Sequence, residues 1–259
     1  ERTRTAYTDK TTEGHSLTIK DLSFKYDIYS PKDILSDINL SIPNGKVTAI
    51  VGASGSGKTT LVKLLLGFYE PLNGSIQIGS ANLNECNLGW WRNQCGAVMQ
   101  EGYLFSGTIA RNIAISDDEP DIERIRHAAR VANIADYVET LPLAYNTMIG
   151  QDGQGISQGQ RQRILIARVV YKNPMFVFLD EATNALDANN ERAITENLSD
   201  FYKGKTVVVV AHRLSTVRNA DQIVVLDDGK IVEVGTHEEL TSKRGKYFAL
   251  VKNQLELGN

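Results

Sequence analysis

The sequence predicts an α/β fold, in which short apolar strands alternate with amphipathic helices along 259 residues. The run Val47 to Val51 ends at a glycine-rich loop and is followed by leucines at helical spacing, which predicts strand, loop and helix. Strand-sized apolar runs return at Met175 to Leu179 and at Thr206 to Ala211, with a helical pattern between them. Such an order is typical of a parallel sheet with crossover helices.

An antiparallel β portion is expected before the first helix. Leu17 to Phe24 alternates imperfectly and predicts an edge strand, while Ile76 to Ile78 follows the turn pair Asn73-Gly74. Near the other end, a hairpin is expected to turn at Asp228-Gly229, and one C-terminal helix is expected near Glu238 to Leu255.

The middle of the chain predicts a helical subdomain at about residues 101–170. From about Thr108 to Leu141 the apolar period is helical, and four residues share one face: Ile122, Ile125, Ala129 and Ala132. The helix between the two later strands has its own apolar stripe: Ala193, Ile194, Leu198 and Phe201. We expect one domain over residues 17–259, preceded at 1–16 by a polar linker from a longer protein, because the sequence begins with Glu1.

The composition disfavours several functions. Hydrophobic residues make up 42% and the net charge is −3, so no overall positive field invites nucleic acid. The apolar runs are too short to cross a bilayer. Cys86 and Cys95 fit neither a disulfide framework nor a zinc pattern, and we expect them to be reduced thiols in a cytosolic protein.

The most specific motif is a phosphate-binding loop. Gly52-Ala53-Ser54-Gly55-Ser56-Gly57-Lys58-Thr59 matches G-x-x-x-x-G-K-[ST] between the predicted strand and helix. Its glycines let backbone N–H groups surround phosphate oxygens at a helix start, where Lys58 would reach the β- and γ-phosphates and Thr59 would bind Mg²⁺. An ordinary glycine-rich turn is the weaker alternative. The motif predicts a P-loop NTPase (RecA-like) core.

Two acids follow the strand Met175 to Leu179, at the strand end where open α/β sheets bind ligands. Asp180 is placed to hold the Mg²⁺ shell, and Glu181 to deprotonate an attacking water. Alone, Glu181 reads equally well as a solvated acid, but the phosphate loop favours the catalytic role.

A third element lies at Ser157 to Gln160, where a helix is expected to begin. Ser157 and Gln160 have the spacing of a capping box, which by itself explains both residues. The same helix start, after a glycine-rich stretch, is also suited to an anion. Since no arginine finger is evident, it is a candidate donor set for a γ-phosphate, either of its own nucleotide or of a partner's.

From about Leu17 to its end the chain resembles the nucleotide-binding domain of an ATP-binding cassette (ABC) transporter. The resemblance implies that Tyr26 stacks on adenine, that Gln100 contacts Mg²⁺ and the attacking water, and that His212 contacts the γ-phosphate. Each of these residues also has a simpler interpretation. Tyr26 would be an aromatic residue that packs on its neighbours, Gln100 a solvated loop residue, and His212 a polar residue that ends a strand. The remaining nucleotide contacts that it implies are Gly52, Ser54, Gly55, Ser56, Gly57, Lys58, Thr59 and Thr60.

The resemblance also implies a shared site. Ser157, Gly159 and Gln160 would bind the γ-phosphate of an opposite subunit, and the loop ending at Asp187 would cross the dimer interface, although Asp187 by default reads as a solvated loop residue. Gln158 departs from the family pattern, which has glycine there, and would be strained if its φ were positive.

The segment Phe105 to Ile113 resembles the exporter type of this family. That type implies ATP and Mg²⁺, a second copy, a membrane domain on the same polypeptide, and the cytoplasmic face of the cell (inner) membrane. The overall similarity of the chain is to peptide and bacteriocin exporters, which implies a peptide or bacteriocin cargo. Tyr103-Leu104-Phe105 is either a docking surface for the membrane domain or part of the core.

Two other classes of protein also contain a phosphate-binding loop. One is a soluble ABC ATPase of DNA repair or translation, but the chain has room for one cassette and no long coiled coil. The other is an unrelated phosphate-loop kinase, which leaves Ser157, Asp187 and His212 without roles.

Overall fold

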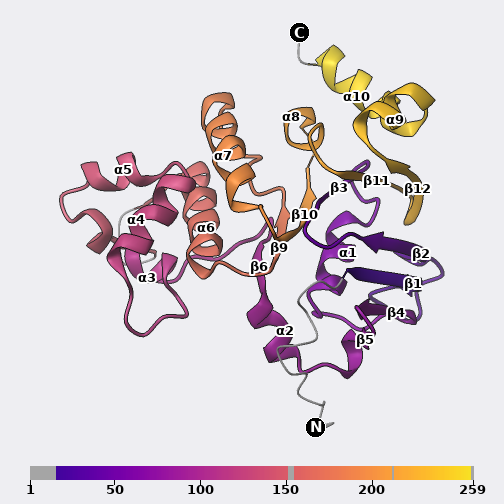
Figure 1. Ribbon diagram of the computed structural model, residues 1–259, viewed down its shortest axis with the longest axis horizontal. Helices are drawn as coiled ribbons and strands as arrows, with labels where there is room; N and C mark the ends of the chain where they lie inside the picture. The colour runs from indigo at the N-terminus through magenta and orange to yellow at the C-terminus, as the bar shows by residue number, and fades with distance from the viewer. Residues whose placement is uncertain (1–15, 151–154, 212, 258–259) are drawn as a thin grey trace. The chain divides into compact units, whose positions relative to one another are not determined.

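The computed structural model describes residues 16–150, 155–211 and 213–257, and it forms two compact units (Figure 1). One unit holds the residues up to Cys95 and those from Gly204 onward, and the other holds Gly96–Lys203. His212 and residues 1–15 of the predicted linker lie outside the described residues. The alternation of strands and helices confirms the predicted α/β class.

The first unit combines an antiparallel sheet, a mainly parallel sheet and short helices. Its strands are β1 Leu17–Phe24, β2 Leu35–Ile42, β3 Val47–Val51, β4 Asn73–Ile78, β5 Ala81–Asn82, β10 Thr206–Val210, β11 Gln222–Asp227 and β12 Lys230–Gly235. Its helices are α1 Lys58–Leu65, the 3₁₀ turn η2 Leu83–Glu85, α2 Leu88–Gln94, α8 Leu214–Val217, α9 His237–Lys243 and α10 Lys246–Leu257.

The antiparallel sheet has the strand order β2-β1-β4-β5, which corrects two predictions. The strand predicted at an edge, β1, pairs with β2 on one side and with β4 on the other. Its alternation is imperfect because the pairing shifts between Ile19 and Leu22, where a bulge interrupts the register. Asn73 and Gly74 are not a turn, because they begin β4, with Asn73 opposite Ser23.

The other strands of this unit lie in the order β12-β11-β3-β10. β3 is parallel to both β10 and β11, so the carboxyl ends of these strands share one edge, and the phosphate loop leaves β3 at that edge. β12 joins β11 through the predicted hairpin turn at Asp228-Gly229. The single predicted C-terminal helix is two helices, because Arg244 takes a left-handed backbone (φ 52°) that ends α9.

The second unit is mainly helical. Its elements are β6 Cys95–Val98, β7 Gly107–Thr108, α3 Ile109–Ile113, α4 Ile122–Val131, α5 Ala135–Thr140, the 3₁₀ turn η3 Ala144–Asn146, β8 Met148–Ile149, α6 Gln158–Lys172, β9 Phe176–Asp180 and α7 Ala188–Phe201.

Helix α6 packs against α3 and α4 (Figure 1). The predicted apolar face is confirmed at Ile125, Ala129 and Ala132, which are buried, but Ile122 is 44% exposed because it begins α4 directly after the capping residue Asp121. The extent of the helical subdomain, about 101–170, stays a prediction.

A polar cluster around Tyr171 fixes the entry to α4. The Tyr171 hydroxyl donates to Asp117 Oδ2 at 2.5 Å and accepts the Asp121 amide at 3.2 Å. The Arg124 guanidinium lies 4.3 Å from the Tyr171 ring centroid. The hydrogen bond from Tyr171 is the largest cause that holds the pKa of Asp117 below its ordinary value.

Tyr171→Phe is expected to lower the midpoint of thermal unfolding at pH 7 by a few degrees, because it removes a charge-assisted hydrogen bond. A carboxylate with a lowered pKa stabilises the fold above its unfolded pKa, and that stabilisation is lost as the pH falls through the folded pKa. The difference between the two proteins should therefore narrow below about pH 4. Thermal unfolding at several pH values tests this, with Tyr103→Phe, at an exposed hydroxyl, as the control. A pH-independent difference would contradict it.

Candidate functional site

The phosphate loop occupies the turn between β3 and α1 in the first unit. Helix α1 begins at Lys58, and its N-cap Gly57 has a left-handed backbone (φ 104°) with no side chain capping the helix. The first N–H groups of a helix need acceptors, and the N-cap residue Gly57 has no side chain that could supply one. An anion at the helix start would satisfy these donors, so the loop fits a phosphate.

The first position of the loop, Gly52, has no room for a side chain. A β-carbon at Gly52 would lie 2.2 Å from the Leu226 carbonyl oxygen and 2.7 Å from Ser56 Oγ. The loop is thus held tightly against β11. Ser54 and Gly55 are exposed at its tip, where they can approach a ligand.

Lys58 lies across the loop rather than in solvent. Its side chain is 5% exposed, and Nζ donates to the carbonyl oxygens of Gly52 (2.9 Å) and Ala53 (2.8 Å). A bound phosphate would compete for these protons with a full negative charge, which forms the stronger bond. Thr59, the predicted Mg²⁺ ligand, follows Lys58 and is partly exposed.

Tyr26 belongs to an aromatic cluster near the start of α1. It is 51% exposed, its hydroxyl lies 3.0 Å from Thr60 Oγ1, and its ring meets those of Phe24 (5.0 Å) and Tyr69 (5.2 Å) edge-on. Tyr26 therefore packs on neighbours and still offers surface to a base, so both of its interpretations have support. Sequence reasoning missed Tyr69, because no spacing pattern joins it to Tyr26.

The two predicted acids end β9 in the second unit. All five residues of β9 are buried, and Asp180 is fully so. Glu181 is partly exposed and has a left-handed backbone (φ 52°), which is rare for a residue with a β-carbon. Gln100 is exposed and lies just after β6, the strand that pairs with β9.

Ser157 and Gln160 form a capping box at the start of α6, as their spacing predicts. The Gln160 amide donates to Ser157 Oγ (3.1 Å), and the Ser157 amide donates to Gln160 Oε1 (2.9 Å). This does not exclude anion binding, because the Ser157 hydroxyl accepts here and keeps its own proton for a second partner. Gln158 is the first residue of α6 and is not among the described residues with positive φ, so the expected strain is absent there.

Gly159 brings the start of α6 onto the loop before α7. A β-carbon at Gly159 would lie 3.2 Å from the Ala185 carbonyl oxygen and 3.3 Å from Leu186 Cδ2. Asp187 is exposed but not merely solvated, because it caps α7 by accepting the amides of Asn189 (3.0 Å) and Asn190 (2.9 Å). The hydrogen bonds from Asn190 are the main reason that the pKa of Asp187 is lowered.

The predicted site residues therefore fall into two groups. Tyr26, Thr60 and the phosphate loop are in the first unit, whereas the second holds Gln100, Ser157, Gly159, Gln160, Asp180, Glu181 and Asp187. His212 lies outside the described residues. Cys86 and Cys95 are buried thiols, and in the described ranges no group of three or more His, Cys, Asp or Glu side chains forms a metal cluster.

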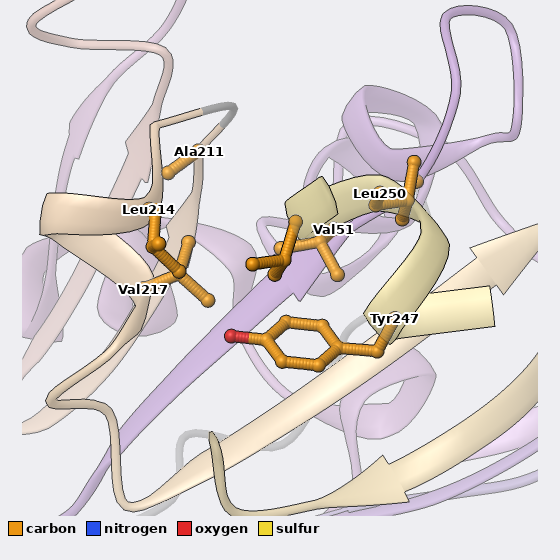
Figure 2. A pocket seen from close by; sticks show the side chains of 8 residues that line it. Val51, Ala211, Leu214, Val217, Tyr247 and Leu250 are labelled. Atoms are coloured by element: carbon orange, nitrogen blue, oxygen red, sulfur yellow. The ribbon is translucent and has the colours of Figure 1, made fainter. Parts of the chain in front are cut away.

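A small cavity is lined in part by the junction of β3 and the phosphate loop (Figure 2). Figure 2 shows Val51 on one side and the Tyr247 ring extending from α10 toward Leu214 and Val217 of α8. Its volume is about 40 Å³, enough for about one water molecule. It is too small for a nucleotide, and it shows that α10 packs against the base of the loop.

The second unit also exposes two aromatic side chains. Tyr103 is 63% and Phe105 49% exposed, with their rings 5.1 Å apart, whereas Leu104 is buried. The core interpretation is therefore wrong for the two aromatics. Asn112 bonds both the amide and the carbonyl of Phe105 (2.9 Å each), and Arg168 donates to the Tyr103 carbonyl (3.0 Å). Sequence reasoning missed these two supports, which lack a local pattern.

Of the two exposed aromatics, Tyr103 borders a pocket of about 400 Å³. Tyr103, Ser106, Ile156 and Arg161 are among its lining residues, so it is both aromatic and positively charged. None of the helices in the described ranges combines the length and the apolar character needed to cross a membrane.

Comparison with known proteins agrees with the motifs. Residues 35–184, more than half of the chain, match the ABC transporter family. The chain is 46% identical over 241 residues to the exotoxin translocation ATP-binding protein PaxB of Pasteurella aerogenes, covering 93% of this chain and 34% of that protein. It is 44% identical over 250 residues to the mitochondrial ATP-binding cassette sub-family B member 10 of Mus musculus, covering 95% of this chain and 35% of that protein.

A solved structure gives the same result in three dimensions. The ATP-bound structure of a bacterial Atm1-family ABC exporter superposes with a TM-score of 0.91 at 35% identity, covering 98% of this chain and 44% of that one. This confirms the predicted ABC ATPase fold and excludes the unrelated kinase. The chain spans about a third of the length of the two relatives named above. It belongs to the ABC transporter family and is an ATPase domain of that family.

Proposed function

We propose that this ATPase powers the export of a polypeptide across a membrane. The observation that carries the ATP-dependent part is the uncapped, glycine-walled phosphate loop that holds Lys58. The export part is supported by relatives whose names describe toxin translocation, PaxB and the alpha-hemolysin translocation protein HlyB of Escherichia coli, 45% identical to this chain.

Each group of the site has a role in this proposal. The loop amides and Lys58 hold the β- and γ-phosphates of ATP, Tyr26 stacks on its adenine, and Thr59, Asp180 and Gln100 hold Mg²⁺. Bound Mg²⁺ neutralises charge on the phosphate oxygens. Glu181 accepts the proton of the attacking water. His212 stays a predicted γ-phosphate contact.

A second copy completes each site. The Ser157 hydroxyl and the start of α6 offer donors on an exposed surface, and in the proposed dimer they bind the γ-phosphate held by the other copy, with Gly159 and Gln160 beside them. ATP then bridges two chains, and its hydrolysis removes the phosphate that holds them together.

Light scattering tests this dimer. Glu181→Gln should form a dimer with ATP, and much less with ADP or without nucleotide, because ATP persists in that variant. Adding Ser157→Arg should abolish the dimer by filling the γ-phosphate pocket. Ser199→Arg, an exposed serine of α7 in the same unit, is the matched control and should leave the dimer intact. A Glu181→Gln chain that stays monomeric at micromolar concentrations with saturating ATP contradicts the shared site.

We propose that the membrane domain docks on the exposed aromatics of the second unit, and that the chain lies at the cytoplasmic face of the membrane. Tyr103 and Phe105 offer apolar surface on a turn that Asn112 and Arg168 hold in shape. Co-expression with an exporter membrane domain supplied as a separate, tagged chain tests the docking. The double variant Tyr103→Ser, Phe105→Ser should lose co-purification and keep its own ATPase activity. Undiminished co-purification contradicts the proposed surface.

The cargo needs its own test. In vesicles that contain the complete transporter, ATP should drive accumulation of a labelled unfolded polypeptide, and Glu181→Gln should not support it. Accumulation of small hydrophobic compounds without polypeptide would contradict a polypeptide cargo and leave the ATPase assignment untouched.

A further inference from the structure

The side-chain amide of Gln162 joins helix α6 to the turn that follows β9. Gln162 is 5% exposed, and both ends of its amide are used. Nε2 donates to the Glu181 carbonyl oxygen at 3.2 Å and also to Asn184 Oδ1, while Oε1 accepts the Ala185 amide at 3.0 Å. One side chain therefore binds both the beginning and the end of the turn that carries Glu181.

The same contacts decide which way the Asn184 amide points. A backbone amide is only a donor and a carbonyl oxygen only an acceptor, so Ala185 and Glu181 fix the orientation of the Gln162 amide. Gln162 Nε2 then requires an oxygen from Asn184, which leaves Asn184 Nδ2 facing the carboxylate of Glu181, 3.4 Å from Oε2. A flipped Asn184 would set oxygen against carboxylate. Gln162 thus fixes the orientation of the Asn184 amide, and the Asn184 amide in turn faces the Glu181 carboxylate.

The turn needs such support because of its backbone. Glu181 has φ 52°, a conformation that a β-carbon disfavours. Within the turn, the Asn184 amide donates to the Glu181 carbonyl at a long 3.3 Å. The two backbone contacts from Gln162 come from a buried position on a helix, a more rigid support than the exposed turn itself.

We propose that Gln162 is a positioning residue for ATP hydrolysis, which aims the Glu181 carboxylate through Asn184. In this role Gln162 touches neither nucleotide nor water. The inference rests on the proposed function, in which Glu181 is the base. Loss of the support would let the carboxylate turn away from the attacking water without altering the phosphate loop. A displacement of about 1 Å at a reacting group lowers a rate by as much as about a hundredfold.

The first test is Gln162→Met, which keeps the length of the side chain and removes its hydrogen bonds. We expect ATP affinity to stay within about twofold and kcat at saturating protein and ATP to fall about tenfold or more. Asn184→Ala should lower kcat by a similar factor. Because Asn184 is exposed, this variant keeps the proposal testable if Gln162→Met does not fold.

The double variant separates positioning from general damage. Gln162 and Asn184 act in one chain of contacts, so Gln162→Met, Asn184→Ala should be no slower than the slower single variant. Tyr171→Phe is the matched control, because it also removes a hydrogen bond made by a buried side chain of α6 and should keep kcat. Unchanged kcat in both single variants overturns the proposal, and so does a double variant whose loss is the product of the two single losses.

Failure of this inference is distinguishable from failure of the proposed function. If Glu181→Gln itself keeps its turnover, Glu181 is not the base and the proposed mechanism fails. If Glu181→Gln is inactive while Gln162→Met and Asn184→Ala are fully active, only the role of Gln162 is overturned.

Discussion

Glu181→Gln is expected to keep ATP and Mg²⁺ bound while cutting turnover by about a hundredfold or more. Glutamine has nearly the same shape as glutamate but cannot accept a proton from water at neutral pH, so only the chemical step suffers. Asp180, the proposed Mg²⁺ ligand, is fully buried at the end of β9 and is unchanged in this variant. Phosphate release and equilibrium ATP binding, measured on the same preparation, separate the two effects.

The control for this prediction is Glu196→Gln, an exposed glutamate of α7 in the same unit, which should leave turnover unchanged. If Glu181→Gln hydrolyses ATP within about twofold of the parent chain, Glu181 is not the base. Gln100 or His212 would then have to carry more of the chemistry.

Lys58→Ala is expected to abolish ATP binding at concentrations that saturate the parent chain. The change removes the ammonium group that would contact the β- and γ-phosphates. It also removes the bonds from Nζ to the carbonyls of Gly52 and Ala53, so the loop loses an internal support. Equilibrium titration with ATP measures the loss.

Lys63→Ala is the matched control, because Lys63 lies on the same helix, more than one turn beyond Lys58. It should bind ATP like the parent. Unchanged affinity in Lys58→Ala would mean that the phosphate loop is not the nucleotide site.

Local chemistry is what sequence reasoning predicted best. The phosphate loop, the capping box at Ser157 and the hairpin at Asp228-Gly229 each depend on a few consecutive residues, and the structure contains each of these turns or caps. The break between α9 and α10 was missed although it had a local signal, since Gly245 follows two basic residues in a pattern typical of a helix end.

Long-range contacts were not predictable in the same way. β1 was assigned to an edge because its second partner, β4, lies far along the chain and its bulge disturbs the alternation. Nothing in the sequence indicated a role for Gln162. The capping box at the start of α6 uses Gln160, and the contacts of Gln162 lie in the turn near Asn184, far along the chain. Tyr103 and Phe105 are apolar like core residues, and only the fold shows that they are exposed.

The specific ATPase activity of the parent chain, followed as a function of its own concentration at saturating ATP and Mg²⁺, decides whether two copies share each site. If two copies share each site, specific activity should rise with protein concentration through the monomer range and then level off as dimers dominate. A specific activity that is the same at every concentration in that range would show that one chain completes its own site, and would contradict the account.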